Sequence, residues 1–238
     1  MRLGIVPYSN CTPLVHGIAC EIFKAPPSKL AQMAEPEDII MAPIVTAFLD
    51  PAWHLLEGVG IGSFGEVDTV KLFYKNENIT PQNIKTIYLD SDSLTSLNLI
   101  KILLQYRFER NLAEIEWTQN KQTETEGKLL IGDKTWSEPS SHGLDLGVCW
   151  TEWTKLPFVY ACWMTKSAAV GKEWKPKLVQ QARHNLKDLE TISQDAALLK
   201  YWRKLVYQLG APQKQGIALF QKYWGELNHQ KVTPLQWI

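Results

Sequence analysis

The sequence has few of the features that mark metal-binding, membrane or nucleic-acid-binding proteins. Its four cysteines form no C-x-x-C pair and have no histidine at zinc-finger spacing, which argues against a structural metal site. The 25 lysine and arginine side chains are balanced by 25 aspartates and glutamates, and both kinds are mixed along the chain. No basic region concentrates nucleic acid or an anionic membrane surface, so we expect neither as a partner.

Long apolar runs are also missing. Every apolar stretch is interrupted within a few residues, whereas a membrane-spanning helix needs ~20 mostly apolar residues. The apolar run at residues 3–6 is too short for the hydrophobic region of a secretory signal, and polar residues follow it. We therefore expect a soluble, cytoplasmic protein in which Cys11, Cys20, Cys149 and Cys162 are reduced and serve packing.

The first third of the chain alternates between strand and helix patterns. Helices are predicted to begin at Pro13 and Ser28, and proline suits a first helical turn because it has no N–H to leave unpaired. Short apolar runs predict strands at residues 3–6, 21–25, 38–41, 55–61 and 69–74. This alternation is typical of an α/β lobe with a largely parallel sheet.

The alternation resumes after a polar stretch at residues 75–82, which looks like a crossing between lobes. Further strands are predicted at 85–89, 114–117, 128–131 and 158–163, an amphipathic helix at 93–108, and helices from 177 onward with a break at 210–212. We predict two lobes: residues 1–75 with 164–238 form lobe I, and 76–163 form lobe II. Strands near 72–75 and 158–163 are expected to join them.

Four segments together resemble the chorismate dehydratase family of the futalosine route to menaquinone. Each segment is weak alone, but their order and spacing over residues 2–163 are specific. The segments are Arg2-Leu3-Gly4-Ile5-Val6 with Tyr8, Asn10, Pro13, Leu14 and Gly17; Gly65-x-Val67-x-Thr69-Val70-x-Leu72-Phe73; Leu89-Asp90-x-x-Ser93-x-Thr95-Ser96; and Leu130-Ile131-Gly132-Asp133 with Asp145-Leu146-Gly147, Trp150, Trp153-Thr154, Leu156-Pro157-Phe158-Val159, Ala161 and Trp163.

The resemblance implies a two-lobed fold of the periplasmic-binding-protein type (type II), with a cleft that closes on a small carboxylate. It also implies removal of water from chorismate to give 3-[(1-carboxyvinyl)oxy]benzoate, without a cofactor. The sequence departs from the family pattern at several points, including the lack of an alanine-aspartate pair before the fourth segment. Leu94 stands where the family usually carries arginine, and residues 43–46 replace a serine-rich turn with Thr46 as the remaining hydroxyl.

The junction at residues 90–96 is the first candidate ligand site. A helix that starts there presents unpaired backbone N–H groups and the positive end of its dipole, and Ser93, Thr95 and Ser96 add hydroxyl donors for a carboxylate. From the residues alone, a serine or aspartate that merely caps the helix is the more frequent arrangement. The resemblance favours a ligand site, with Ser93 as a catalytic residue and Thr95 and Ser96 as substrate-binding residues.

Asn10 is the second candidate, in the turn after the first predicted strand, where open α/β lobes place ligand groups. Its amide can donate and accept hydrogen bonds, although an asparagine here can equally support the turn before Pro13. The resemblance makes Asn10 a catalytic residue that contacts the substrate. Thr46 and Thr69 are weaker candidates for substrate binding.

Two alternatives to a chorismate dehydratase stay open. One is a protein of the same fold that binds a small carboxylate without converting it, which Leu94 favours. The other is the related dihydroxynaphthoate synthase, although the Tyr8-x-Asn10-x-x-Pro13-Leu14 start fits the dehydratase better. The motifs hold no pair of carboxylates, no Ser/His/Asp set and no Cys/His pair, so positioning and electrostatics are expected to carry the catalysis.

Overall fold

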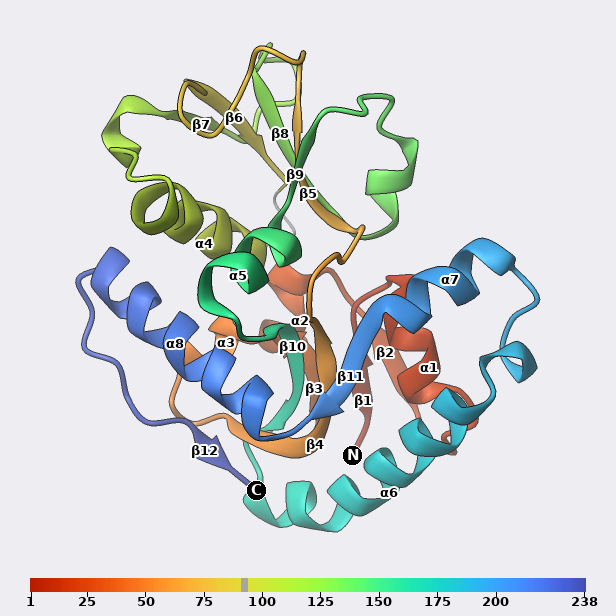
Figure 1. The fold of residues 1–238 in the computed structure, drawn as a ribbon. Coiled ribbons are helices and arrows are strands. Elements are labelled where there is room, and N and C mark those ends of the chain that lie inside the picture. The colour runs from red at the N-terminus through yellow and green to blue at the C-terminus, as the bar shows by residue number, and fades with distance from the viewer. Residues whose placement is uncertain (91–93) are drawn as a thin grey trace.

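The strands form two separate sheets (Figure 1), in a computed structural model that describes residues 1–90 and 94–238. The first sheet has the order β11-β4-β10-β3-β1-β2, with β12 beside β4, and the second has the order β7-β6-β8-β5-β9. The first sheet consists of β1 (Leu3–Ile5), β2 (Ile22–Lys24), β3 (Ile39–Pro43), β4 (His54–Ser63), β10 (Phe158–Thr165), β11 (Leu205–Leu209) and β12 (Gln236–Trp237). The second consists of β5 (Val70–Tyr74), β6 (Thr86–Leu89), β7 (Glu116–Thr118), β8 (Gly127–Ile131) and β9 (Gly143–Asp145).

Each sheet contains a parallel part and an antiparallel part. In the first sheet β2, β1 and β3 are parallel, while β10 and β11 run antiparallel to their neighbours. In the second sheet β7, β6 and β8 are parallel, while β5 is antiparallel to β8 and β9. The α/β class is confirmed, but the expected largely parallel sheet holds only for these two groups of three strands and for the short pairing of β12 with β4.

Central strands are apolar because helices cover both of their faces. All residues of β1 and β3 are buried, and so are the last five residues of β4. The helices are α1 (Thr12–Val15), α2 (Pro27–Met33), α3 (Val45–Leu49), α4 (Leu94–Ile102), α5 (Leu146–Thr154), α6 (Ala168–Lys187), α7 (Ala196–Lys204) and α8 (Ala211–Leu227). Figure 1 shows α4 and α5 beside the second sheet, and α6 and α8 along the first. Among the described residues, no helix combines the length and apolarity that a membrane crossing needs.

The chain passes between the sheets at residues 64–69, between β4 and β5, and at residues 146–157, between β9 and β10. We predicted lobe boundaries at residues 75 and 163, with strands 72–75 and 158–163 running from lobe to lobe. Instead, β5 lies wholly in the second sheet and β10 wholly in the first. The polar stretch at 75–82 is a loop between β5 and β6, and its polarity reflects exposure to solvent.

Asp145 holds the first of these crossings in place. Its carboxylate accepts hydrogen bonds from the backbone N–H groups of Val67 and Asp68, at 3.1 and 2.9 Å. It also caps α5, accepting from the N–H groups of Gly147 and Val148 at 2.9 and 3.1 Å. The Asp145 side chain therefore fixes both the crossing at residues 64–69 and the amino-terminal end of α5, which lies in the crossing at residues 146–157.

Candidate functional site

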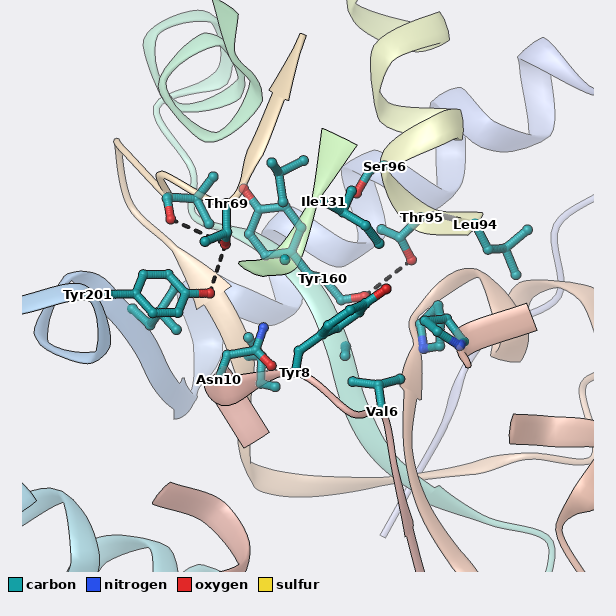
Figure 2. Close-up of a pocket in the computed structure, with 18 residues that line it drawn as sticks. Val6, Tyr8, Asn10, Thr69, Leu94, Thr95, Ser96, Ile131, Tyr160 and Tyr201 are labelled. Atoms are coloured by element: carbon teal, nitrogen blue, oxygen red, sulfur yellow. Dashed lines mark hydrogen bonds between the residues drawn. The ribbon is translucent and has the colours of Figure 1, made fainter. Parts of the chain in front are cut away.

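A cleft lies between the two sheets, where the carboxyl ends of their parallel strands meet. The segments that follow β1, β3, β6 and β8 all contribute to it, as open α/β folds place ligands at such strand ends. The lining residues, drawn as sticks in Figure 2, are Val6, Tyr8, Asn10, Pro27, Pro43, Ile61, Val67, Thr69, Val70, Leu94, Thr95, Ser96, Ile131, Gly132, Tyr160, Ala161, Tyr201 and Leu205.

The cleft is apolar with a few hydroxyl and amide groups, and none of its described lining residues carries a charged side chain. The space between its atoms is about 600 Å³ when the open mouth is included. Small-molecule sites have this general composition, with a mostly apolar wall and a few polar groups that fix orientation. The described wall therefore offers an anionic ligand neutral donors and helix dipoles.

The amino-terminal turn of α4 forms one wall of the cleft through Leu94, Thr95 and Ser96. The Thr95 hydroxyl donates a hydrogen bond to the backbone carbonyl of Tyr160 at 3.1 Å (Figure 2), so its proton is used within the protein. Ser96 is buried against the cleft. The structure thus brings Thr95 and Ser96 to one helix end, where the dipole favours negative charge. The predicted catalytic residue Ser93 lies outside the described residues.

Asn10 and Thr69 meet on the opposite wall, on either side of Tyr201. The Thr69 and Tyr201 hydroxyl oxygens are 2.7 Å apart and form a hydrogen bond. Burial raises the pKa of Tyr201 above its ordinary value, so this phenol is a neutral donor and acceptor. Asn10 Oδ1 is buried without a hydrogen-bond partner among the described residues.

Contacts across the mouth of the cleft join the two sheets. The Ser9 hydroxyl donates to Asp133 Oδ1 at 2.8 Å, and the ring of Trp136 meets the ring of Tyr201 edge-on, with centroids 5.4 Å apart. Gly132 has φ +63°, and a Cβ there would come within 2.8 Å of the Tyr8 ring. Glycine is therefore required at this point by both backbone conformation and space.

Thr46 is not among the residues that line the cleft. It is buried in α3, and the turn before it is tied to β10 because the Ile44 N–H donates to the Tyr160 carbonyl at 3.0 Å. Pro43 reaches the cleft from this segment instead. The structure thus gathers Asn10, Thr69, Thr95 and Ser96 around one space and leaves Thr46 outside it.

Three tyrosines of the cleft were not among the predicted site residues. Tyr8 belongs to the amino-terminal motif, and Tyr160 to an aromatic run that is typical of a buried strand. Tyr201 lies on the amphipathic helix α7, beyond the segments that carry the family resemblance. The sequence holds no local signal for Tyr201, because only the packing of α7 against the first crossing brings it to Thr69.

An acidic group of Glu66, Asp68 and Asp145 lies at the first crossing, with carboxylate oxygens within 4.8 Å of one another. Lys204 pairs with Glu66 and Asp68 at 2.7 and 2.5 Å, and Lys71 lies 3.3 Å from Asp68. Burial raises the pKa of Asp145 above its ordinary value, against the lowering effect of the backbone N–H groups that it accepts from. These carboxylates serve ion pairs and capping at the crossing.

The cleft can bind and orient an anion, but its described residues offer no side chain that is a strong base at neutral pH. Tyr160, like Tyr201, has a pKa raised by burial, and its hydroxyl lies 3.2 Å from that of Ser63. The chemistry that this arrangement supports is one in which precise placement and neutral hydrogen bonds are enough.

Residues 1–226 match a family described as menaquinone biosynthesis. A curated relative is the chorismate dehydratase of Thermus thermophilus. It is 25% identical over an alignment 267 positions long, and the alignment covers 94% of each protein.

Solved structures confirm the fold. A protein from Archaeoglobus fulgidus superposes with a TM-score of 0.68 at 16% identity, over 96% of this chain and 97% of that one. A ligand-binding component of an ABC-type import system from Staphylococcus aureus gives 0.65 at 10% identity, over 99% and 94%. The periplasmic aliphatic sulphonate binding protein SsuA from Escherichia coli gives 0.59 at 14% identity, over 99% and 92%.

Proposed function

Because the chain belongs to the menaquinone biosynthesis family, we propose that it is a chorismate dehydratase. In this proposal it is a carbon–oxygen lyase that converts chorismate to 3-[(1-carboxyvinyl)oxy]benzoate and water in the cytoplasm, as a step of the futalosine route. The relationship to a chorismate dehydratase over 94% of both chains supports the proposal. The observation that carries it is the convergence of Asn10, Thr69 and the amino-terminal end of α4 on one cleft.

The proposal divides the binding of chorismate between two walls. The end of α4, with Ser96, holds a carboxylate of the dianion through neutral donors and the helix dipole. Asn10 and Thr69 lie on the wall that receives the ring substituents. Apolar surface for the ring comes from Val6, Val67, Leu94 and Ile131.

The reaction removes one ring proton and the ring hydroxyl, and the aromatic ring that results supplies the driving force. Since the described wall of the cleft holds no strong side-chain base, we propose that a carboxylate of the substrate itself takes the proton. The protein then contributes by holding that carboxylate near the proton and the hydroxyl in line to leave. A cofactor is not required by this chemistry.

The test is incubation of the purified protein with chorismate, followed by mass analysis for the loss of one water. We expect conversion by the wild-type protein and a slower rate for Asn10→Ala, with a melting temperature close to that of the wild type. Calorimetry on the same samples measures binding. Unchanged chorismate in a sample that binds it would contradict the dehydratase and establish the carboxylate-binding protein, which the uncharged cleft and Leu94 also suit.

A further inference from the structure

The turn after β1 and the turn after β8 meet at the mouth of the cleft, one from each sheet. The half-buried Ser9 hydroxyl in the first turn donates a hydrogen bond to Asp133 Oδ1 in the second, at 2.8 Å. The residues that precede them, Tyr8 and Gly132, line the cleft, and the Tyr8 ring projects into it from the first turn (Figure 2). Ser9 and Asp133 are not lining residues, so their hydrogen bond lies beside the space for a ligand rather than within it.

The turn that carries Ser9 is fixed to the first sheet and its helices. The Ser9 carbonyl accepts a hydrogen bond from Trp202 Nε1 at 3.0 Å, and the Asn10 carbonyl accepts one from the Tyr207 hydroxyl, also at 3.0 Å. Trp202 belongs to α7 and Tyr207 to β11, and both side chains are buried. This turn therefore cannot leave the first sheet without breaking buried hydrogen bonds.

The turn that carries Asp133 is fixed to the second sheet in the same way. The Gly132 N–H donates to the carbonyl of Thr69, just before β5, at 2.8 Å. Lys134 Nζ lies 2.8 Å from a carboxylate oxygen of Asp90, the residue after β6. Because each turn is held to its own sheet, a movement that separates the two sheets at the mouth has to break the hydrogen bond between the turns.

We propose that Ser9 and Asp133 form a clasp that has to open whenever a ligand enters or leaves the cleft. The edge-on contact of Trp136 with Tyr201 spans the same gap, so the hydrogen bond is one part of the restraint. Since the clasp is not part of the cleft wall, it restrains the free and the bound protein alike. Its loss should therefore speed both entry and exit and leave the dissociation constant unchanged. The inference rests on the proposed function for its ligand, chorismate, but not on turnover.

The test is stopped-flow mixing with chorismate, followed by tryptophan fluorescence. The slope and intercept of the observed rate against chorismate concentration give the association and dissociation rate constants. Ser9→Ala and Asp133→Ala should each raise both constants about fivefold. The double variant should gain no more than either single variant, because all three lack the same bond. Ser137→Ala is the matched control: its hydroxyl donates to the Lys134 carbonyl within the same turn, so neither constant should change.

Two outcomes would overturn the clasp. One is a faster dissociation with an unchanged association rate constant, which would show that the two residues support the bound state rather than guard the entrance. The other is a double variant whose effect equals the product of the single effects, since the two side chains would then act independently. Mass analysis of the same samples tests the proposed function separately: chorismate that binds with clasp-dependent rates but stays intact would contradict the dehydratase and support the clasp.

Discussion

At the scale of single residues, Asp38 shows how one buried charge can tie two strands together. It precedes β3, it is 2% exposed, and its carboxylate accepts from the Arg2 guanidinium at 2.6 Å and from the Arg2 and Glu35 backbone N–H groups at 2.9 Å. Burial raises the pKa of Asp38, but the Arg2 hydrogen bond and the backbone N–H groups outweigh it, so the pKa lies below its ordinary value.

This lowered pKa predicts an acid-sensitive contribution to stability. A carboxyl with a lower pKa in the folded state stabilises the fold above its unfolded pKa of about 3.8 and loses that effect as the pH falls through the folded value. Asp38→Asn should lower the free energy of unfolding by about 1–3 kcal/mol at neutral pH. Urea unfolding between about pH 2 and 7 should show the two proteins converging in acid. A constant difference across that range would contradict the assignment.

Leu94 is the residue at which the chain most clearly departs from the family pattern, and the structure puts it in the wall of the cleft. Sequence alone left open whether an arginine at this position would reach a ligand or pair elsewhere. Position 94 is the first residue of α4, the helix whose end is proposed to hold a carboxylate, so an arginine there would begin at the cleft wall.

Leu94→Arg should therefore tighten the binding of chorismate about tenfold to a hundredfold, since it adds a charge-assisted contact. The gain should shrink as salt is added, because the interaction is ionic. Calorimetry at two salt concentrations measures both effects, and Leu94→Met is the uncharged control of similar length. If Leu94→Met gives the same gain, added apolar contact rather than charge is responsible.

At the scale of elements, most strands and helices could be predicted from the sequence, because the spacing of apolar residues shows which face of an element is buried. The first three strands, the start of α1 and the helix from residue 94 follow their patterns closely. The short strand β11 was missed inside a stretch with a helical pattern, since its pairing with β4 is set by tertiary contacts. α5 was missed because its aromatic side chains resemble a buried strand more than an amphipathic helix.

The crossings between the sheets were harder to predict than the elements they join. Polarity at residues 75–82 indicated a connection, but exposure alone makes any surface loop polar. What identifies the true crossing at residues 64–69 is the hydrogen bonding of Val67 and Asp68 to Asp145, 77 residues further along the chain from Asp68. Such a long-range contact has no periodic signal in a single sequence.

Asp145→Ala should therefore weaken both the crossing and α5. It removes a helix cap and leaves the N–H groups of Val67 and Asp68 without their acceptor, so we expect a loss of at least about 2 kcal/mol in the free energy of unfolding. Asp145→Asn keeps one oxygen and should lose less. Chemical denaturation of the three proteins measures these differences, and equal stability of the alanine variant and the wild type would contradict the structural role.

At the scale of the whole molecule, the two sheets share one cleft, and the site depends on segments from both. The sequence indicated Asn10, Thr69, Thr95 and Ser96, because these positions follow strands or begin a helix. It did not indicate Tyr201, since α7 reaches the cleft only after the carboxy-terminal part of the chain has packed beside the first crossing. Residues supplied by late, distant elements are the part of a site that local patterns do not reveal.

Whether this cleft removes water from chorismate can be measured in a single-turnover experiment. The purified protein is mixed in excess over chorismate and the reaction is stopped at increasing times for mass analysis, so that even a slow enzyme converts every substrate molecule. We expect complete conversion of chorismate to a product lighter by one water, with slower formation by Asn10→Ala. Chorismate that stays intact while fully bound to the wild-type protein would contradict it.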